Sequence, residues 1–88
     1  KMKRLSIGLT EMEKMNTRER KKILERFLGH KIDGIVYGCI VKTKGIADCG
    51  EFRVRHLDEC AYSNIKVKRI DANITEFTIY DFDKKEWI

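Results

Sequence analysis

The chain has 88 residues, of which 42% are hydrophobic and 38% charged, and its net charge is +5. This length corresponds to one domain, which we place over residues 1–88, and the hydrophobic content excludes a disordered chain. No apolar run approaches the ~18 residues of a membrane span, so we expect no membrane partner. The first 44 residues hold 12 Lys/Arg against five Asp/Glu, and the remainder hold seven against nine. An anionic partner would therefore meet the N-terminal half first.

The N-terminal segment RLSIGL alternates apolar and polar residues, with Leu5, Ile7 and Leu9 in phase. This alternation predicts a short, half-buried strand. Thr10 and Glu13 then have the spacing of a capping box, which predicts that a helical turn begins nearby. The pattern leaves open whether this turn is continuous with the helix that follows.

A second capping box, Asn16 with Glu19, begins the segment NTRERKKILERFLG, and Gly29 ends it. Because a glycine commonly terminates a helix in the left-handed conformation, the segment predicts a helix over Thr17–Leu28. At about 100° per residue, four apolar residues share one side of this helix. They are Ile23, Leu24, Phe27 and Leu28.

The opposite side of that helix carries Arg18, Lys22 and Arg26 at i, i+4 and i+8. Neighbours in such a row lie roughly 6 Å apart, and like charges at this spacing slightly destabilise a helix. The row is either a solvated helix face or a set of phosphate contacts.

From residue 31 onward the pattern changes to strands. The segments IDGIVYGCIVKT, EFRVRHL, NIKVKRID and TEFTIYDF alternate or are strand-length, KGIADCG is predicted to be a loop, and residues 71–73 and 83–85 are predicted turns. The fold class is therefore α+β. A short strand and one main helix within residues 4–29 pack on a small antiparallel sheet of four to five strands, within residues 31–88. The sheet is either an open meander or an SH3-like barrel.

Strand alternation places Arg53 and Arg55 on one outward face, and Lys66 and Lys68 on another. If these strands pair, the two cation pairs are expected to lie side by side, and Lys42 and Lys44 are expected to continue the outward pattern of the preceding strand. Like charges opposite each other are destabilising, so such a face favours anions. The alternative is that outward lysines protect a sheet edge against aggregation.

Three tyrosines, Tyr37, Tyr62 and Tyr80, add stacking surfaces that unpaired bases use. The chain contains no RNP signature, no KH-type GXXG loop and no C2H2 pattern, so we expect phosphate contacts with weak sequence preference. The leading hypothesis is a non-enzymatic regulator that binds RNA or another single-stranded nucleic acid. Its predicted contacts are Arg18, Lys22, Arg26, Lys42, Lys44, Arg53, Arg55, Lys66 and Lys68.

The C-terminal segment YDFDKKEWI supports a second hypothesis, because it interleaves acidic residues with Tyr80, Phe82 and Trp87. Such aromatic residues can anchor a protein partner, including a nucleic-acid-binding protein. This favours an inhibitor, either antitoxin-like or a phage anti-defence protein. The short, proline-free composition, rich in Lys, Ile and Asp, resembles small accessory proteins of large bacteriophages, but this likeness assigns no role to any residue.

The three cysteines, Cys39, Cys49 and Cys60, are an odd number, which argues against a complete disulfide framework and for free thiols in the cytoplasm. With His56 they form the pattern C-x6-H-x3-C, which lacks the close ligand pair typical of zinc sites. We therefore expect no metal and no cofactor.

A third and weaker hypothesis is a metal-independent ribonuclease. Such enzymes combine a general acid, a general base and a cation that binds the phosphate. The residue types are present in His30, Glu51, Arg55, His56 and Asp58, but their spacing does not join them into a site. His56 shares the inward alternation of its strand, which favours a hydrogen-bonded histidine in the core.

Overall fold

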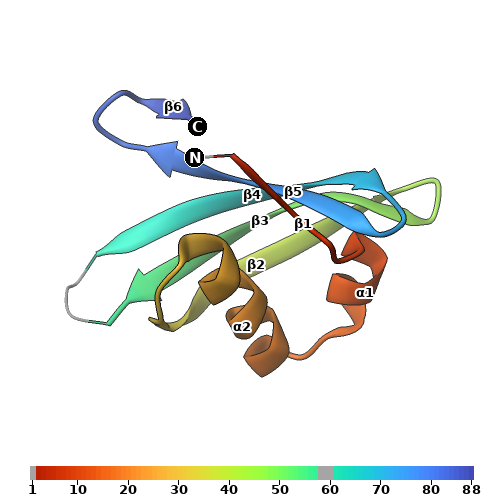
Figure 1. Cartoon of the computed structure of the whole chain (residues 1–88), viewed down its shortest axis with the longest axis horizontal. Helices are drawn as coiled ribbons and strands as arrows, with labels where there is room; N and C mark the ends of the chain where they lie inside the picture. Colours follow the sequence, from red (N-terminus) through yellow and green to blue (C-terminus); the bar gives the residue numbers. More distant parts are fainter. Residues whose placement is uncertain (1, 58–60) are drawn as a thin grey trace.

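A computed structural model describes residues 2–57 and 61–88. In chain order its elements are β1 (Lys3–Leu5), α1 (Leu9–Lys14), α2 (Thr17–Leu28), β2 (Ile32–Thr43), β3 (Ile46–His56), β4 (Tyr62–Asp71), β5 (Ile74–Asp81) and β6 (Glu86–Trp87). Both helices lie on one side of an antiparallel six-stranded sheet (Figure 1). The predicted α+β class is confirmed, with two helices in place of one and six strands in place of four or five.

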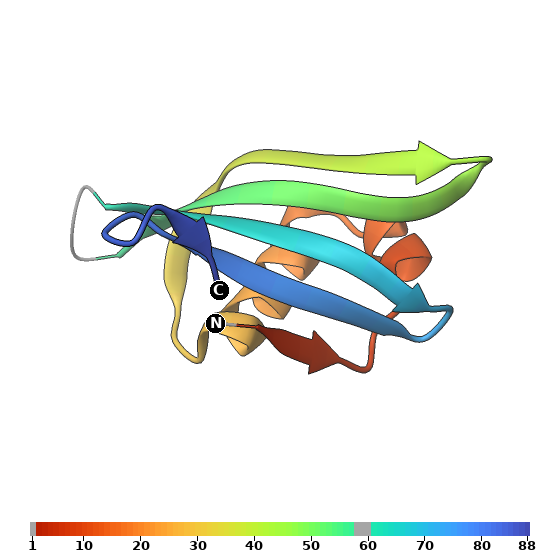
Figure 2. The ribbon, with the colours of Figure 1, turned by 90° about the horizontal axis from the view of Figure 1, so that it is seen from above.

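The sheet is open. Its strand order is β1-β5-β4-β3-β2, with β6 paired to a further stretch of β5, so β2 forms one edge (Figure 2). The SH3-like barrel is therefore wrong, because a barrel requires the first and last strands of this order to pair.

The main helix has the predicted bounds and caps. Asn16 accepts a hydrogen bond from the backbone N–H of Glu19, and the Glu19 carboxylate accepts one from the N–H of Asn16. Gly29 ends α2 with φ of 80°. The capping box predicted at Thr10 is wrong, since α1 begins after Gly8 without a side-chain cap. The chain breaks around Met15, so residues 11–28 form two helices.

Arg20 joins the two helices. Its Nε donates to the carbonyl oxygen of Met12 at 3.0 Å, and a terminal nitrogen donates to that of Glu13 at 2.8 Å. These carbonyls belong to the last turn of α1, where the carbonyl oxygen of Met12 also accepts a hydrogen bond from the N–H of Met15. The same guanidinium lies 6.0 Å from the ring centre of Phe52 in β3. One side chain therefore caps α1 and fixes the angle between the helices above the sheet.

The strand connections are tighter than the sequence suggested. Lys44 and Gly45 form a two-residue turn with φ of 53° and 80°, and β3 begins directly after it. The loop predicted over KGIADCG is thus wrong, because a turn with two positive φ angles needs no more residues. The turns predicted at residues 71–73 and 83–85 are present, and in the first of them Asp71 accepts a hydrogen bond from the N–H of Asn73.

The core lies between the helices and the sheet. The ring of Phe27 stacks on that of Phe77 with centroids 5.4 Å apart, and the predicted apolar side of α2 is buried or partly buried. The hydroxyl of Thr75 donates to the carbonyl oxygen of Ile7, which ties the N-terminal segment to β5. The fully buried side chains of the sheet include Phe52, Val54, Ile65, Val67 and Phe77. All of them have the inward alternation that the sequence predicted.

We expect Arg20→Lys to destabilise the fold by about 1–3 kcal/mol, because an ammonium group cannot reproduce both hydrogen bonds of the guanidinium. The free energy of unfolding in urea would measure this loss. Arg18→Lys, two residues earlier on the exposed side of α2, is the matched control and should change stability by less than about 0.5 kcal/mol. Equal losses for the two variants would contradict the role of Arg20 as a joint.

Candidate functional site

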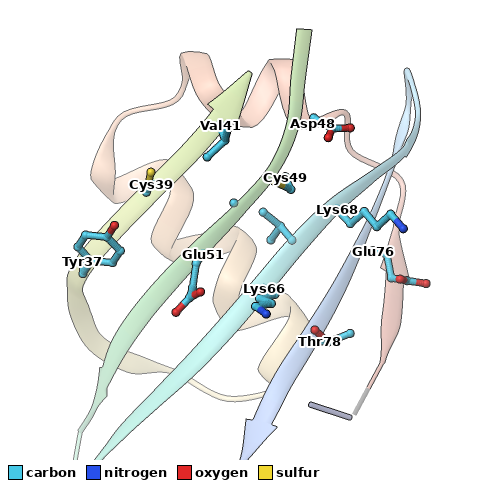
Figure 3. Close-up of a pocket in the computed structure, with 12 residues that line it drawn as sticks. Tyr37, Cys39, Val41, Asp48, Cys49, Glu51, Lys66, Lys68, Glu76 and Thr78 are labelled. Atoms are coloured by element: carbon cyan, nitrogen blue, oxygen red, sulfur yellow. The ribbon is translucent and has the colours of Figure 1, made fainter. Parts of the chain in front are cut away.

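The face of the sheet that points away from α1 and α2 carries neither helix (Figure 1), and it is hollowed. Its hollow has a volume of about 670 Å³ and is bordered by side chains from β2, β3, β4 and β5 (Figure 3). Its main side chains are Tyr37, Cys39, Val41, Cys49, Glu51, Lys66, Lys68, Glu76 and Thr78. We call this surface the open face.

Charges of opposite sign alternate across the open face. Lys66 lies opposite Glu51 of β3, and Lys68 lies opposite Glu76 of β5. Glu76 also forms an ion pair with Arg4 at 3.6 Å. The face is therefore partly self-neutralised, since opposite charges on facing strands attract each other.

The prediction that the two cation pairs of β3 and β4 lie side by side is wrong. Arg53 lies opposite Asn64, and Arg55 lies opposite Tyr62. The strands are shifted so that the lysines of β4 face Cys49 and Glu51 instead. Alternation alone predicted the outward face of each strand, whereas the register depends on where the connecting segment lets the two strands meet.

Lys42 and Lys44 do not belong to the open face, so this prediction is also wrong. Lys42 lies opposite the buried Ala47 and forms an ion pair at 3.3 Å with Glu13 of α1. Lys44 lies in the β2–β3 turn. The reason is the bulge between Ile35 and Tyr37, which changes the alternation of β2, so that Ile35 and Ile40 pack on the core while Tyr37 is exposed.

Arg55 is engaged within its own chain. Its Nε donates to Oδ2 of Asp33 at 2.7 Å, and a terminal nitrogen lies 2.6 Å from the same oxygen. The hydrogen bond and the charge of Asp33 raise the pKa of the Arg55 guanidinium above its ordinary value. A phosphate would have to compete with this carboxylate, so Arg55 is a weaker candidate contact than Arg53.

Two cations of the open face lie over aromatic rings. The guanidinium of Arg53 is 5.1 Å from the ring centre of Tyr62, and the ammonium of Lys66 is 4.2 Å from that of Trp87. Tyr37, opposite Arg53 on the other side, is 56% exposed. Cations and aromatic rings thus form a band across the open face. Its members are Tyr37 of β2, Arg53 of β3, Tyr62, Asn64 and Lys66 of β4, and Trp87 of β6. Sequence reasoning missed Asn64, because only the register places it in this band.

The three aromatic residues predicted to bind a protein form one cluster. The ring of Tyr80 lies 4.8 Å from that of Phe82 and 5.2 Å from that of Trp87, edge to face in both cases. Phe82 is 55% exposed. Asp81 is occupied locally, because its Oδ1 accepts hydrogen bonds from two backbone N–H groups of the turn.

The cation row of α2 lies on the other side of the molecule, since α2 packs against the face of the sheet opposite the open face (Figure 1). Arg18, Lys22 and Arg26 are exposed, and within residues 2–57 and 61–88 they form no ion pair. The acidic residues of the helix are engaged elsewhere: Glu19 in the cap, and Glu25 with the backbone N–H of Ile32 at 2.9 Å. The predicted helix and sheet contacts therefore belong to two surfaces on opposite sides of the sheet.

The residues of the ribonuclease hypothesis are only partly brought together. The rings of His30 and His56 lie 5.4 Å apart, and Nε2 of His56 is 2.7 Å from the hydroxyl oxygen of Ser63. Glu51 lies on the open face, away from these rings, and Arg55 is paired with Asp33. Asp58 and Cys60 lie outside the described residues. Cys39 and Cys49 are free thiols, and no group of three or more metal-ligating side chains occurs among the described residues.

No family model matches this chain, and neither a curated protein nor a solved structure is significantly similar to it. No helix in the described ranges is long and apolar enough to cross a membrane. Any assignment of function therefore depends on the surfaces of the protein itself.

The phenol of Tyr37 should titrate above its ordinary pKa of 10.0. The neighbouring Cys39 side chain raises this pKa, first as a hydrogen-bond partner and then through its charge, with a smaller contribution from Glu51. Because a thiol normally ionises before a phenol, the thiolate opposes the second negative charge. Ultraviolet titration of wild type and Tyr37→Phe would isolate the Tyr37 signal, and Cys39→Ala should bring its pKa down. No downward shift in Cys39→Ala would contradict this coupling.

Proposed function

We propose that this protein binds single-stranded nucleic acid, RNA in preference to duplex DNA, on the open face of its sheet, and that it does so without catalysis. The observation that carries the proposal is the band in which Arg53 lies over Tyr62 and Lys66 lies over Trp87, next to the exposed Tyr37. The proposed place of action is the cytoplasm, where thiols such as those of Cys39 and Cys49 stay reduced.

Stacking supports this choice of ligand. Every base has an aromatic face, and a base that stacks on a protein side chain contributes about 1–3 kcal/mol to binding without regard to sequence. Rings on neighbouring strands lie about 5 Å apart or at multiples of that spacing, so an extended strand can contact several of them. A duplex hides its base faces and offers nothing to such rings.

The mixed charge of the open face predicts modest electrostatics. Arg53, Lys66 and Lys68 are available to phosphates, but Glu51 and Glu76 lie among them. Binding should therefore depend more on stacking and less on salt than it would on a purely basic surface. Asn64 supplies an amide that can donate to and accept from a base edge.

The inhibitor hypothesis is the second candidate, and the cluster of Tyr80, Phe82 and Trp87 favours it. An exposed ring within such a cluster resembles the aromatic anchors of protein interfaces. Trp87 is shared with the band, because Lys66 lies over it. The same face can thus bind bases or a protein, and the two candidates are separated by whether nucleic acid binds at all.

The test compares two double variants that remove the same charge from opposite sides of the molecule. Arg53→Gln with Lys66→Gln alters the band, and Arg18→Gln with Lys22→Gln alters the helix row. We expect the first pair to weaken binding of an unstructured RNA by about tenfold or more, which is about 1.4 kcal/mol. The second pair should weaken it by less than about threefold, measured as Kd by fluorescence anisotropy.

Salt dependence provides a second readout of the same experiment. With three cations in contact, log K against log salt should have a slope of about −2 for a single strand. A larger loss in the helix pair would instead place the site on α2, and a slope of about −4 or steeper would require about six phosphate contacts, more than the open face alone supplies. A failure of RNA and single-stranded DNA to bind at low salt would overturn the proposal in favour of the inhibitor.

A further inference from the structure

We propose that β2 pairs with β2 of a second copy of this chain, antiparallel across a two-fold axis at Cys39, so that two sheets join edge to edge. The two edges of the sheet differ. The outer edge of β5 is covered by β1 and then by β6, whereas no strand in the described ranges pairs with the outer edge of β2 (Figure 2). This inference does not depend on the proposed nucleic-acid binding.

The composition of β2 makes its edge unusual. Natural edge strands are protected by being short, by lysine or by proline. β2 has 12 residues, and its residues 34–41 contain neither a charged side chain nor proline. Three of its large apolar side chains are about half exposed: Val36 at 47%, Tyr37 at 56% and Val41 at 48%. Bulges, another protective device, occur at both ends but leave a regular stretch between them. A long, uncharged and apolar edge predicts a strand as its partner.

The bulges define the register of that partner. Pairing with β3 is regular over residues 37–41, between a shift after Ile35 and another after Val41. Two antiparallel copies of this stretch overlap fully only when Cys39 faces Cys39 of the second copy. On the open face, Tyr37 of each copy then lies opposite Val41 of the other copy. Aromatic–β-branched pairs of this kind stabilise antiparallel strands.

The helix side of the strand fits the same register. Gly38 then faces Ile40 of the second copy. A second hollow, of about 200 Å³, lies beside Gly38 and is bordered by Thr17, Arg20 and Phe52. The glycine is required there, since a Cβ at position 38 would lie 2.8 Å from the Phe52 ring. Ile40 of the second copy, which is partly buried in its own core, would then cover a space that this chain leaves unfilled.

The charges at the ends of β2 select a second copy over an unrelated strand. Asp33 precedes the uncharged stretch and Lys44 follows it, while Lys42 is already paired with Glu13 of its own chain. In an antiparallel self-pair the acidic end of each copy lies near the basic end of the other, which is the complementarity a two-fold interface requires. Both contacts from Arg55 use Oδ2 of Asp33, so neither occupies Oδ1.

A ladder of this length is small for a stable interface, so we expect a dimer that dissociates in the micromolar range or above. Sedimentation of the reduced protein without nucleic acid, from about 1 μM to about 1 mM, should show a rise from the 10.4 kDa monomer towards twice that mass. Cys39→Lys should weaken association at least tenfold, because it places two ammonium groups opposite each other. The folded monomer tolerates it, since Glu51 faces this position within the chain. Cys39→Ser is the neutral control and should still associate.

Cross-linking tests the register directly. A variant with Cys49→Ser and Cys60→Ser retains only Cys39, and mild oxidation by copper–phenanthroline should convert it to a covalent dimer. The matched variant with Cys39→Ser and Cys60→Ser retains Cys49, which is the more exposed thiol but lies one strand inside the edge. Faster cross-linking through Cys49, a monomer throughout the concentration range, or equal association of Cys39→Lys and Cys39→Ser would each overturn the proposal. A monomer that still binds RNA would leave the proposed function intact.

Discussion

The structure depends on the burial of a single face of the sheet. Phe52, Val54, Ile65, Val67 and Phe77 all point to the side where the two helices lie, and all are fully buried. An antiparallel sheet can expose its second face to water, but the side chains there must then be compatible with solvent and with one another. The position of the helices therefore determines which residues are free to bind a partner.

The open face meets that requirement with alternating charge. Facing strands place Lys66 opposite Glu51 and Lys68 opposite Glu76, so the sheet is not held apart by repulsion. As a consequence, the electrostatic attraction of the open face for phosphates is weaker than the net charge of +5 suggests. Under the proposed function, aromatic rings are therefore expected to be the main source of affinity, with the cations over them adding contacts to bases and phosphates. If two copies join through β2, two such faces become one longer surface.

The sequence predicted the features that depend on neighbours within a few residues. The Asn16 capping box, the end of α2 at Gly29 and the inward side chains of β3 and β4 all follow from spacings of two to four residues. The failures concern relations between distant segments. The pairing of Arg53 with Asn64 joins two strands, which alternation within one strand does not describe, and the side to which the residues of β2 point depends on the bulge at Val36. The prediction that Lys42 and Lys44 continue the outward sheet face fails for the same reason, since Lys42 lies opposite Ala47 and Lys44 lies in a turn.

The central claim is that nucleic acid binds the open face. Titration of the isotopically labelled protein with an unstructured RNA, followed by amide and side-chain NMR shifts, tests it residue by residue. The account predicts that the largest changes occur at Tyr37, Arg53, Asn64 and Lys66 and at the Trp87 indole, with small changes at Arg18, Lys22 and Arg26. Changes concentrated on α2, with the open face unaffected, would contradict it.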